Sequence, residues 1–135
     1  MTVLPFPAQQ RLPVLLIEDE PSVMACIRAA LERGGYDVVC CESGVEALPV
    51  LEDGRFLGVI SDMRTPGGVS GADVHAWLAA HRPELATRMV FITGDIANDE
   101  TTDTLQKTGA PCVEKPFRVR QFISVVEKTL GKAPS

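Results

Sequence analysis

The sequence has no block of lysine or arginine residues and no basic stripe. Its formal net charge is −5, from 13 lysines and arginines against 18 aspartates and glutamates. Folded domains that bind DNA or RNA depend on a concentrated positive surface. The charge pattern therefore argues against direct nucleic-acid binding.

Long apolar runs and paired cysteine motifs are also missing. No run approaches the ~18 residues of a membrane span, and the N-terminus lacks the charged start and apolar stretch of a secretory signal. The four cysteines include no CxxC and no Cys/His spacing suited to zinc. Cys40 and Cys41 are adjacent, so they would point to opposite faces of a strand. We expect free thiols, a cytoplasmic location and no membrane contact by this domain.

The residues that are present alternate between two kinds of pattern. With 135 residues, 45% of them apolar, the chain is long enough for one domain with a single core. Short apolar runs alternate with segments of helical periodicity, which predicts an α/β fold of the (βα)5 type: a doubly wound, five-stranded parallel sheet with right-handed crossovers. We expect the domain to span residues 12–131, with a proline-containing tail or linker at 1–11 and a short tail at 132–135. The predicted strands are 12–17, 36–41, 56–61, 89–92 and 112–114.

Several residues predict where helices begin or weaken. Ser43 with Glu46, and Ser70 with Asp73, have the spacing of a capping box. Pro49 falls inside a predicted helix, which it should kink or shorten. The helix predicted over 98–108 is rich in threonine, a poor helix former, so we expect it to be loosely held.

Three acidic side chains fall at the ends of predicted strands. Glu18 and Asp19 follow the first strand, and Asp62 ends the third, before the loop Thr65-Pro66-Gly67-Gly68. The carboxyl ends of parallel strands meet at one edge of a sheet, where open α/β folds bind ligands. Clustered carboxylates repel one another, and oxygen ligands suit a hard cation such as Mg²⁺. We therefore predict a magnesium site at this edge.

Two further strand ends complete the chemistry. Lys115 ends the fifth strand and supplies a positive charge, Thr93 ends the fourth strand and supplies a hydroxyl, and Gly94 leaves room for a substrate. A carboxylate nucleophile, a divalent cation, a lysine and a hydroxyl together form a phosphoryl-transfer site. Asp62 is the candidate nucleophile and phosphate acceptor.

With these motifs the chain resembles the receiver domain of two-component response regulators, the CheY-like family. The resemblance covers roughly residues 11–131 and implies the strand order 2-1-3-4-5. It also implies that the domain is not a metabolic enzyme and catalyses only its own phosphorylation and dephosphorylation. The matching motifs are Leu16-Ile17-Glu18-Asp19-Glu20, Asp62-Met63-Arg64-Thr65-Pro66, Ile92-Thr93-Gly94-Asp95 and Glu114-Lys115-Pro116-Phe117.

The resemblance implies a role for each site residue. Asp62 would accept a phosphoryl group from a histidine kinase or a histidine phosphotransfer domain, and the signal would pass on by conformational change. Lys115 would pair with the acyl phosphate, Thr93 would bond a phosphoryl oxygen, and the Lys115–Pro116 peptide bond would be cis. The Mg²⁺ ligands would be Asp19, Asp62 and the backbone carbonyl of Arg64, with Glu18 acting through a water molecule.

The resemblance is finer for the receivers at the C-terminus of hybrid histidine kinases. Thr93-Gly94-Asp95 and Thr108-Gly109-Ala110-Pro111 carry it. The proline-containing start would then be an interdomain linker, although a single-domain regulator fits the sequence equally well. A second copy of the chain is a further candidate partner, in a weak homodimer.

Two positions depart from the family pattern, and a pair of residues is a third notable feature. Cys112 stands where the family often has a switch aromatic, so the signal would leave through the 98–108 helix, or the domain would mainly pass on or drain phosphate. Gly71 comes one residue later than usual after Asp62, which predicts a longer and more mobile loop. We also expect Arg64 and Asp95 to meet across the mouth of the site and hinder the attacking water.

Other classes of protein fit less well. A phosphatase of the haloacid dehalogenase type needs a second acid two residues after its nucleophile, where this chain has Arg64. A flavodoxin-like nucleotide or flavin module needs a glycine-rich phosphate loop after the first strand, where this chain has three acids. A pseudo-receiver that acts only through protein contacts, or a phosphate sink, remains the alternative within the family.

Overall fold

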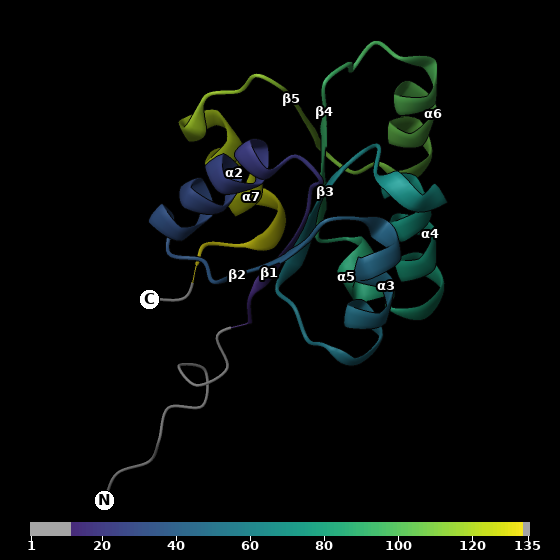
Figure 1. The fold of residues 1–135 in the computed structure, drawn as a ribbon, viewed down its shortest axis with the longest axis horizontal. Helices are drawn as coiled ribbons and strands as arrows, with labels where there is room; N and C mark the ends of the chain where they lie inside the picture. The colour runs from purple at the N-terminus through teal and green to yellow at the C-terminus, as the bar shows by residue number, and fades with distance from the viewer. Residues whose placement is uncertain (1–11, 134–135) are drawn as a thin grey trace, which may run out of the picture.

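The structure is a computed structural model that describes residues 12–133. Both predicted tails lie largely outside these residues: 1–11 entirely, and 134–135 at the other end. Strands and helices alternate along the chain, as shown in Figure 1. In order, the elements are β1 (Val14–Ile17), α2 (Pro21–Arg33), β2 (Val38–Cys41), α3 (Gly44–Asp53), β3 (Gly58–Asp62), the 3-10 helix η1 (Pro66–Gly68), α4 (Gly71–His81), α5 (Pro83–Ala86), β4 (Met89–Thr93), α6 (Asp99–Thr108), β5 (Cys112–Glu114) and α7 (Val119–Leu130).

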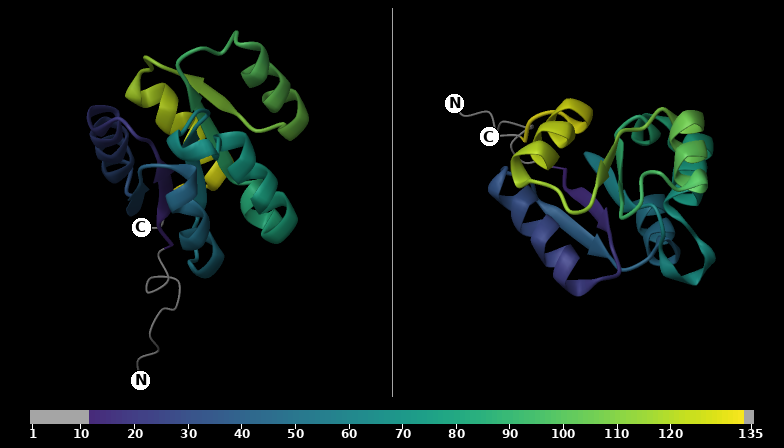
Figure 2. Two further views of the ribbon diagram at one scale, coloured as in Figure 1. Left: turned by 45° about the vertical axis from the view of Figure 1, so that its right-hand side comes forward. Right: turned by 90° about the horizontal axis from the view of Figure 1, so that it is seen from above.

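The five strands form one parallel sheet in the order β2-β1-β3-β4-β5, which confirms the predicted fold and strand order. The register aligns Ile17 of β1 with Ser61 of β3, and Asp62 with Ile92 of β4. The carboxyl ends of β1, β3, β4 and β5 therefore lie side by side at one edge (Figure 2). This edge carries the acidic residues that follow or end the strands.

Helices cover both faces of the sheet. Helices α2 and α7 lie on one face, and α3 to α6 lie on the other (Figure 1). Alternate residues of each strand enter different cores, as expected for side chains that point to opposite faces. In β1, Val14 and Leu16 pack with the α2 and α7 side, whereas Leu15 and Ile17 pack with the α3 and α4 side. Because both faces are covered, the central strands β1, β3 and β4 are buried except at Asp62, which explains their continuous apolar runs.

The helix starts follow the predicted caps in part. At α4 both hydrogen bonds of the Ser70–Asp73 capping box are present. At α3 the Ser43 hydroxyl accepts the Glu46 N–H at 3.1 Å, and this half of the box is the one that forms. Pro49 does not shorten α3, which continues to Asp53.

Two short elements were not expected from the sequence. Residues 83–86 form a separate helical turn, α5, because Pro83 suits the first turn of a helix and starts a new one after α4 ends. Residues 66–68 form the short 3-10 helix η1 within the predicted loop, again started by a proline. Among residues 12–133, no helix is both long and apolar enough to span a membrane.

Candidate functional site

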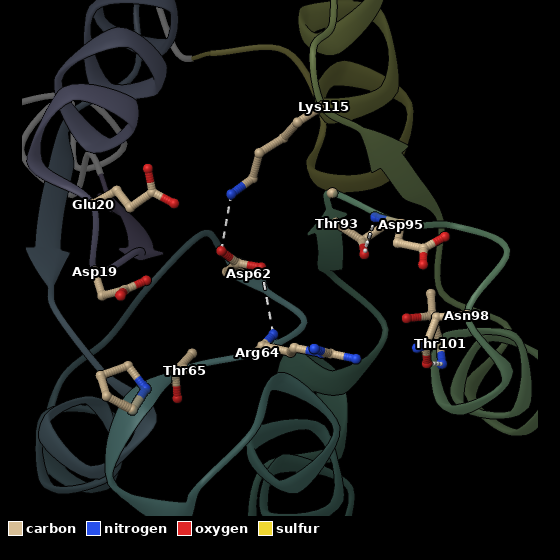
Figure 3. A pocket seen from close by; sticks show the side chains of 12 residues that line it. Asp19, Glu20, Asp62, Arg64, Thr65, Thr93, Asp95, Asn98, Thr101 and Lys115 are labelled. Carbon is tan, nitrogen blue, oxygen red and sulfur yellow. Dashed lines mark hydrogen bonds and ion pairs between the residues drawn. The ribbon is translucent and has the colours of Figure 1, made fainter.

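A pocket of about 470 Å³ opens at the carboxyl edge of the sheet (Figure 3). It collects side chains from four strand ends, from the loop after β3 and from α6. Most of the predicted site residues lie in its wall. The lining residues are Asp19, Glu20, Asp62, Arg64, Thr65, Pro66, Thr93, Gly94, Asp95, Asn98, Thr101 and Lys115.

Asp62 stands at the centre of this pocket. It is the last residue of β3, and its side chain is 13% exposed, so an incoming group can reach it. Its Oδ2 accepts a hydrogen bond from Lys115 Nζ at 2.9 Å, and Oδ1 accepts the Arg64 N–H at 3.4 Å. Figure 3 shows both contacts. The carboxylate is thus held in place by two donors at the edge of open space.

Glu18 lies beneath the pocket and is fully buried. Its carboxylate accepts hydrogen bonds from Lys115 Nζ at 3.1 Å and from the Glu20 N–H at 3.0 Å. Burial raises the pKa of Glu18, these two donors oppose that rise, and the nearby negative charge of Asp62 adds to it. The net shift of the Glu18 pKa is upward, which means that its surroundings disfavour the charged form of this carboxylate.

Lys115 supplies the counter-charge for both acids. Burial alone would lower the pKa of Lys115, but its hydrogen bonds to Asp62 and Glu18 outweigh that effect and raise it. The side chain therefore carries a full positive charge at neutral pH. The Lys115–Pro116 peptide bond is cis, as expected, and Lys115 points inward to Asp62 (Figure 3).

The three acids have the chemistry of a site for a hard cation. One carboxylate oxygen from each of Glu18, Asp19 and Asp62 lies within 4.8 Å of the others. Mg²⁺ binds through a few carboxylates and keeps several waters, and Asp19 is exposed on the open side of the cluster. The donor set therefore fits a magnesium ion, as predicted.

Magnesium should stabilise the folded protein, because binding to the native state alone raises the free energy of unfolding. We expect millimolar Mg²⁺ to raise the melting temperature of the wild type in a thermal melt. Asp19→Asn, which removes an exposed charge on the open side of the cluster, should lose most of this rise. A rise of equal size in Asp19→Asn would place the ion elsewhere.

Thr93 has a buried side chain beside the open part of the pocket. It is 5% exposed, and its hydroxyl oxygen accepts the Asp95 N–H at 3.1 Å. Its own hydroxyl proton is therefore available to a ligand. No heavy atom lies within 4 Å of the position that a Cβ would take on Gly94, which confirms that this residue leaves space.

Arg64 and Asp95 line opposite parts of the pocket but do not meet. No ion pair joins them among the described residues, so the predicted contact across the mouth is wrong for this structure. The Asp95 carboxylate instead turns back to its own loop, where Oδ1 accepts the Ala97 N–H at 3.2 Å. The Arg64 side chain is exposed, and its backbone amide is the group that contacts Asp62.

Thr65 anchors the loop that follows Asp62, a role that sequence reasoning missed. Its hydroxyl accepts the Gly44 N–H at 3.1 Å and donates to the Val69 carbonyl. Its place in the Asp62–Pro66 motif was the available signal. Asn98 and Thr101 were also missed, because only the tertiary position of α6 brings them to the pocket.

Cys112 is half-buried and packs against the core on the α3 to α6 side of the sheet, against which Leu105 and Ala110 also pack. Burial, with smaller contributions from the charges of Glu114 and Asp62, raises the pKa of its thiol to about 11. The buried Cys41 thiol is raised to about 11 as well, again mainly by burial.

These thiols should differ in reactivity, because the thiolate is the nucleophile. At pH 8 we expect iodoacetamide to label the exposed Cys26 first, and Cys41 and Cys112 only after unfolding. Labelling of native Cys112 should rise only as the pH approaches 11. Peptide mapping of the labelled protein measures this order, and early labelling of Cys112 at pH 8 would contradict it.

Comparisons with known proteins place the chain in a family. The model of the response regulator receiver domain matches residues 14–127. The response regulator FleR of Pseudomonas aeruginosa is 30% identical over 122 residues, and the chain spans only about a quarter (25%) of its length. The polar-differentiation response regulator DivK of Brucella anthropi is 28% identical over an alignment 126 residues long, which covers 97% of that protein and 89% of this chain.

Solved structures show the same fold. The signal receiver domain of a signal transduction histidine kinase from Syntrophus aciditrophicus has a TM-score of 0.77 at 26% identity and covers 88% of this chain and 89% of its own. The receiver domain of a Pseudomonas aeruginosa sensor histidine kinase has a TM-score of 0.77 at 23% identity, over 90% of this chain and 98% of its own. That structure holds a magnesium ion in its active-site cleft. The chain belongs to the response regulator receiver domain family and is a CheY-like receiver of two-component signalling.

Proposed function

We propose that Asp62 is the phosphoacceptor of this receiver and that residues 12–131 form the complete receiver domain. The observation that supports this most directly is the position of the Asp62 carboxylate. It lies within 2.9 Å of Lys115 Nζ, beside two further acids, and at the edge of an open pocket. The Asp62 carboxylate, the proposed nucleophile, thus lies next to both a positive counter-charge and a cation site.

The chain's own residues explain how the transfer proceeds. A carboxylate oxygen of Asp62 attacks the phosphorus of a phosphohistidine whose other ring nitrogen is protonated. The P–N bond breaks, and neutral imidazole leaves with the bonding electrons. Lys115 stays within reach of the acyl phosphate and balances its charge, and the Thr93 hydroxyl donates a hydrogen bond to a phosphoryl oxygen. A magnesium ion held by Asp19, Asp62, the Arg64 carbonyl and, through water, Glu18 would screen the negative charges of donor and acceptor.

The partner is a histidine kinase or a histidine phosphotransfer domain, which is the kind of partner that receiver domains use. In this proposal the chain works either as a single-domain regulator or as the receiver of a hybrid histidine kinase. It catalyses its own phosphorylation and dephosphorylation, and no other reaction. The altered residue at Cys112 changes how the signal leaves the site.

The nature of the bond formed tests this proposal. The protein is incubated with Mg²⁺ and phosphoramidate, a small donor that also breaks a P–N bond, and then treated with hydroxylamine. We expect one phosphoryl group that hydroxylamine removes, because an acyl phosphate is cleaved and a serine or threonine phosphate is not. A label that resists hydroxylamine, or one that forms equally well in EDTA, would contradict the proposal.

A further inference from the structure

The loop between β4 and α6 connects Thr93 to the surface. It spans residues 94–98 and carries Ile96, whose side chain is 38% exposed. Its internal hydrogen bonds are local: the Asp95 N–H to the Thr93 hydroxyl, the Ala97 N–H to Asp95 Oδ1, and the Asn98 N–H to the Asp95 carbonyl at 3.3 Å. The loop is also tied to the start of α6, because the Thr102 hydroxyl donates to the Ile96 carbonyl at 3.4 Å and Asn98 caps the helix. The loop and the start of α6 can therefore move together.

One contact reaches this loop from a neighbouring strand. Glu114, the last residue of β5, accepts the Ile96 N–H with Oε2 at 3.3 Å. Within residues 12–133, this is the one hydrogen bond that joins residues 94–98 to an element outside the segment from β4 to α6, residues 89–108. The backbone places Glu114 opposite Thr93 in the sheet, and the next N–H, that of Lys115, bonds the Thr93 carbonyl at 2.8 Å.

The side chains of β5 explain why this contact matters here. Alternate residues of a strand point to the same face, so Cys112 and Glu114 lie on one face of β5. Cys112 has a short side chain that packs against the core on the α3 to α6 side of the sheet, as Leu105 and Ala110 also do. Glu114 is exposed and is the β5 side chain that contacts the loop.

We propose that Glu114 is a positioning residue that holds the β4–α6 loop in its unphosphorylated arrangement. This inference rests on the proposed function. When the Thr93 side chain moves toward a phosphoryl group on Asp62, its hydroxyl oxygen moves away from the Asp95 N–H and the loop shifts. The bond between Glu114 and Ile96 then breaks, and Ile96 takes a new position at the surface.

The hydrogen bond from the Ile96 N–H to Glu114, called the latch below, can be tested first without phosphate. Amide hydrogen exchange at Ile96 is measured by NMR in wild type, Glu114→Ala and Glu114→Gln. Loss of one hydrogen bond to a carboxylate should speed Ile96 exchange about fivefold in Glu114→Ala, whereas Glu114→Gln keeps an acceptor oxygen and retains part of the protection. Glu52→Ala is the matched control, because the side chain of this exposed glutamate of α3 forms no hydrogen bond or ion pair with the described residues. Equal exchange in all four proteins would overturn the latch.

The coupling to the site is tested with beryllofluoride, a non-covalent phosphoryl analogue, in the presence of Mg²⁺. If Glu114 holds the loop back, Glu114→Ala should bind beryllofluoride about fivefold more tightly than wild type and Glu52→Ala. Equal affinity in all three would overturn the coupling. Failure of the wild type to bind beryllofluoride or to accept phosphate would instead count against the proposed function, while the Ile96 exchange rates would still decide whether the latch exists.

Discussion

Replacing Lys115 with alanine is expected to slow phosphorylation of Asp62 about 100-fold. The Lys115 ammonium contacts both Asp62 and Glu18, at 2.9 and 3.1 Å. The incoming phosphoryl group brings more negative charge to the same place, and without Lys115 that charge has no fixed partner in the protein. The initial rate of phosphorylation by acetyl phosphate, followed by intact mass, measures the effect.

Lys115→Ala should also lower the stability of the metal-free protein and raise its affinity for Mg²⁺. Without Lys115, Glu18 and Asp62 repel each other with no counter-charge, so the free energy of unfolding should fall by about 1–3 kcal/mol in EDTA. A cation then replaces the lost charge, so Mg²⁺ should bind about tenfold more tightly and restore much of the stability.

Lys107→Ala is the matched control for the loss of a lysine. Lys107 pairs with Asp103 at 3.0 Å, but both side chains are more than 60% exposed. Such surface pairs contribute about 0–1 kcal/mol, so this variant should keep the wild-type rate, Mg²⁺ affinity and stability. If Lys115→Ala behaved like Lys107→Ala, Lys115 would not be part of the site.

Replacing Gly71 with alanine is expected to displace Asp62 and to destabilise the fold by about 1–3 kcal/mol. A Cβ on Gly71 would lie 2.6 Å from the Asp62 carbonyl oxygen and 3.2 Å from Met63 Cα. Both are backbone atoms, so no side-chain rotation can relieve the clash. Alanine favours helices over glycine by about 1 kcal/mol, but Gly71 is the first residue of α4, where this gain is small. Urea unfolding and the phosphorylation rate should both show the loss.

Gly94→Ala provides the comparison for this variant. Gly94 also borders the site, but its Cβ would meet no heavy atom within 4 Å, and it is not one of the described glycines with positive φ. Its free energy of unfolding should stay within about 0.5 kcal/mol of wild type. Equal stability of Gly71→Ala and Gly94→Ala would contradict the close contact between α4 and the Asp62 backbone.

Much of the fold and of the acidic site could be predicted from the sequence because the signals are local. Buried strands read as continuous apolar runs, and the ends of parallel strands must meet at one edge. Glu18, Asp19 and Asp62 therefore had to converge once the sheet was inferred. The cap at Ser70 was equally predictable, since it depends on residues three positions apart.

Other features depend on side-chain directions that no local pattern specifies. Arg64 and Asp95 hold the expected positions, but the Asp95 carboxylate bonds its own loop instead of Arg64. The contact between Glu114 and Ile96 joins residues 18 positions apart and follows from the β4–β5 register. The helical turn at 83–86 has no separate signal in the sequence, because Pro83 closely follows the end of α4 and also starts the next helix.

Phosphorylation of Asp62 is tested most directly by intact mass after incubation with acetyl phosphate and Mg²⁺. Three proteins are compared: wild type, Asp62→Ala and Asp53→Ala, which removes an exposed aspartate of α3 that forms no hydrogen bond or ion pair within the described part of the chain. We predict the mass gain of one phosphoryl group in wild type and Asp53→Ala, and none in Asp62→Ala. A gain that persists in Asp62→Ala, or no gain in the wild type, would contradict the assignment of Asp62 as the phosphoacceptor.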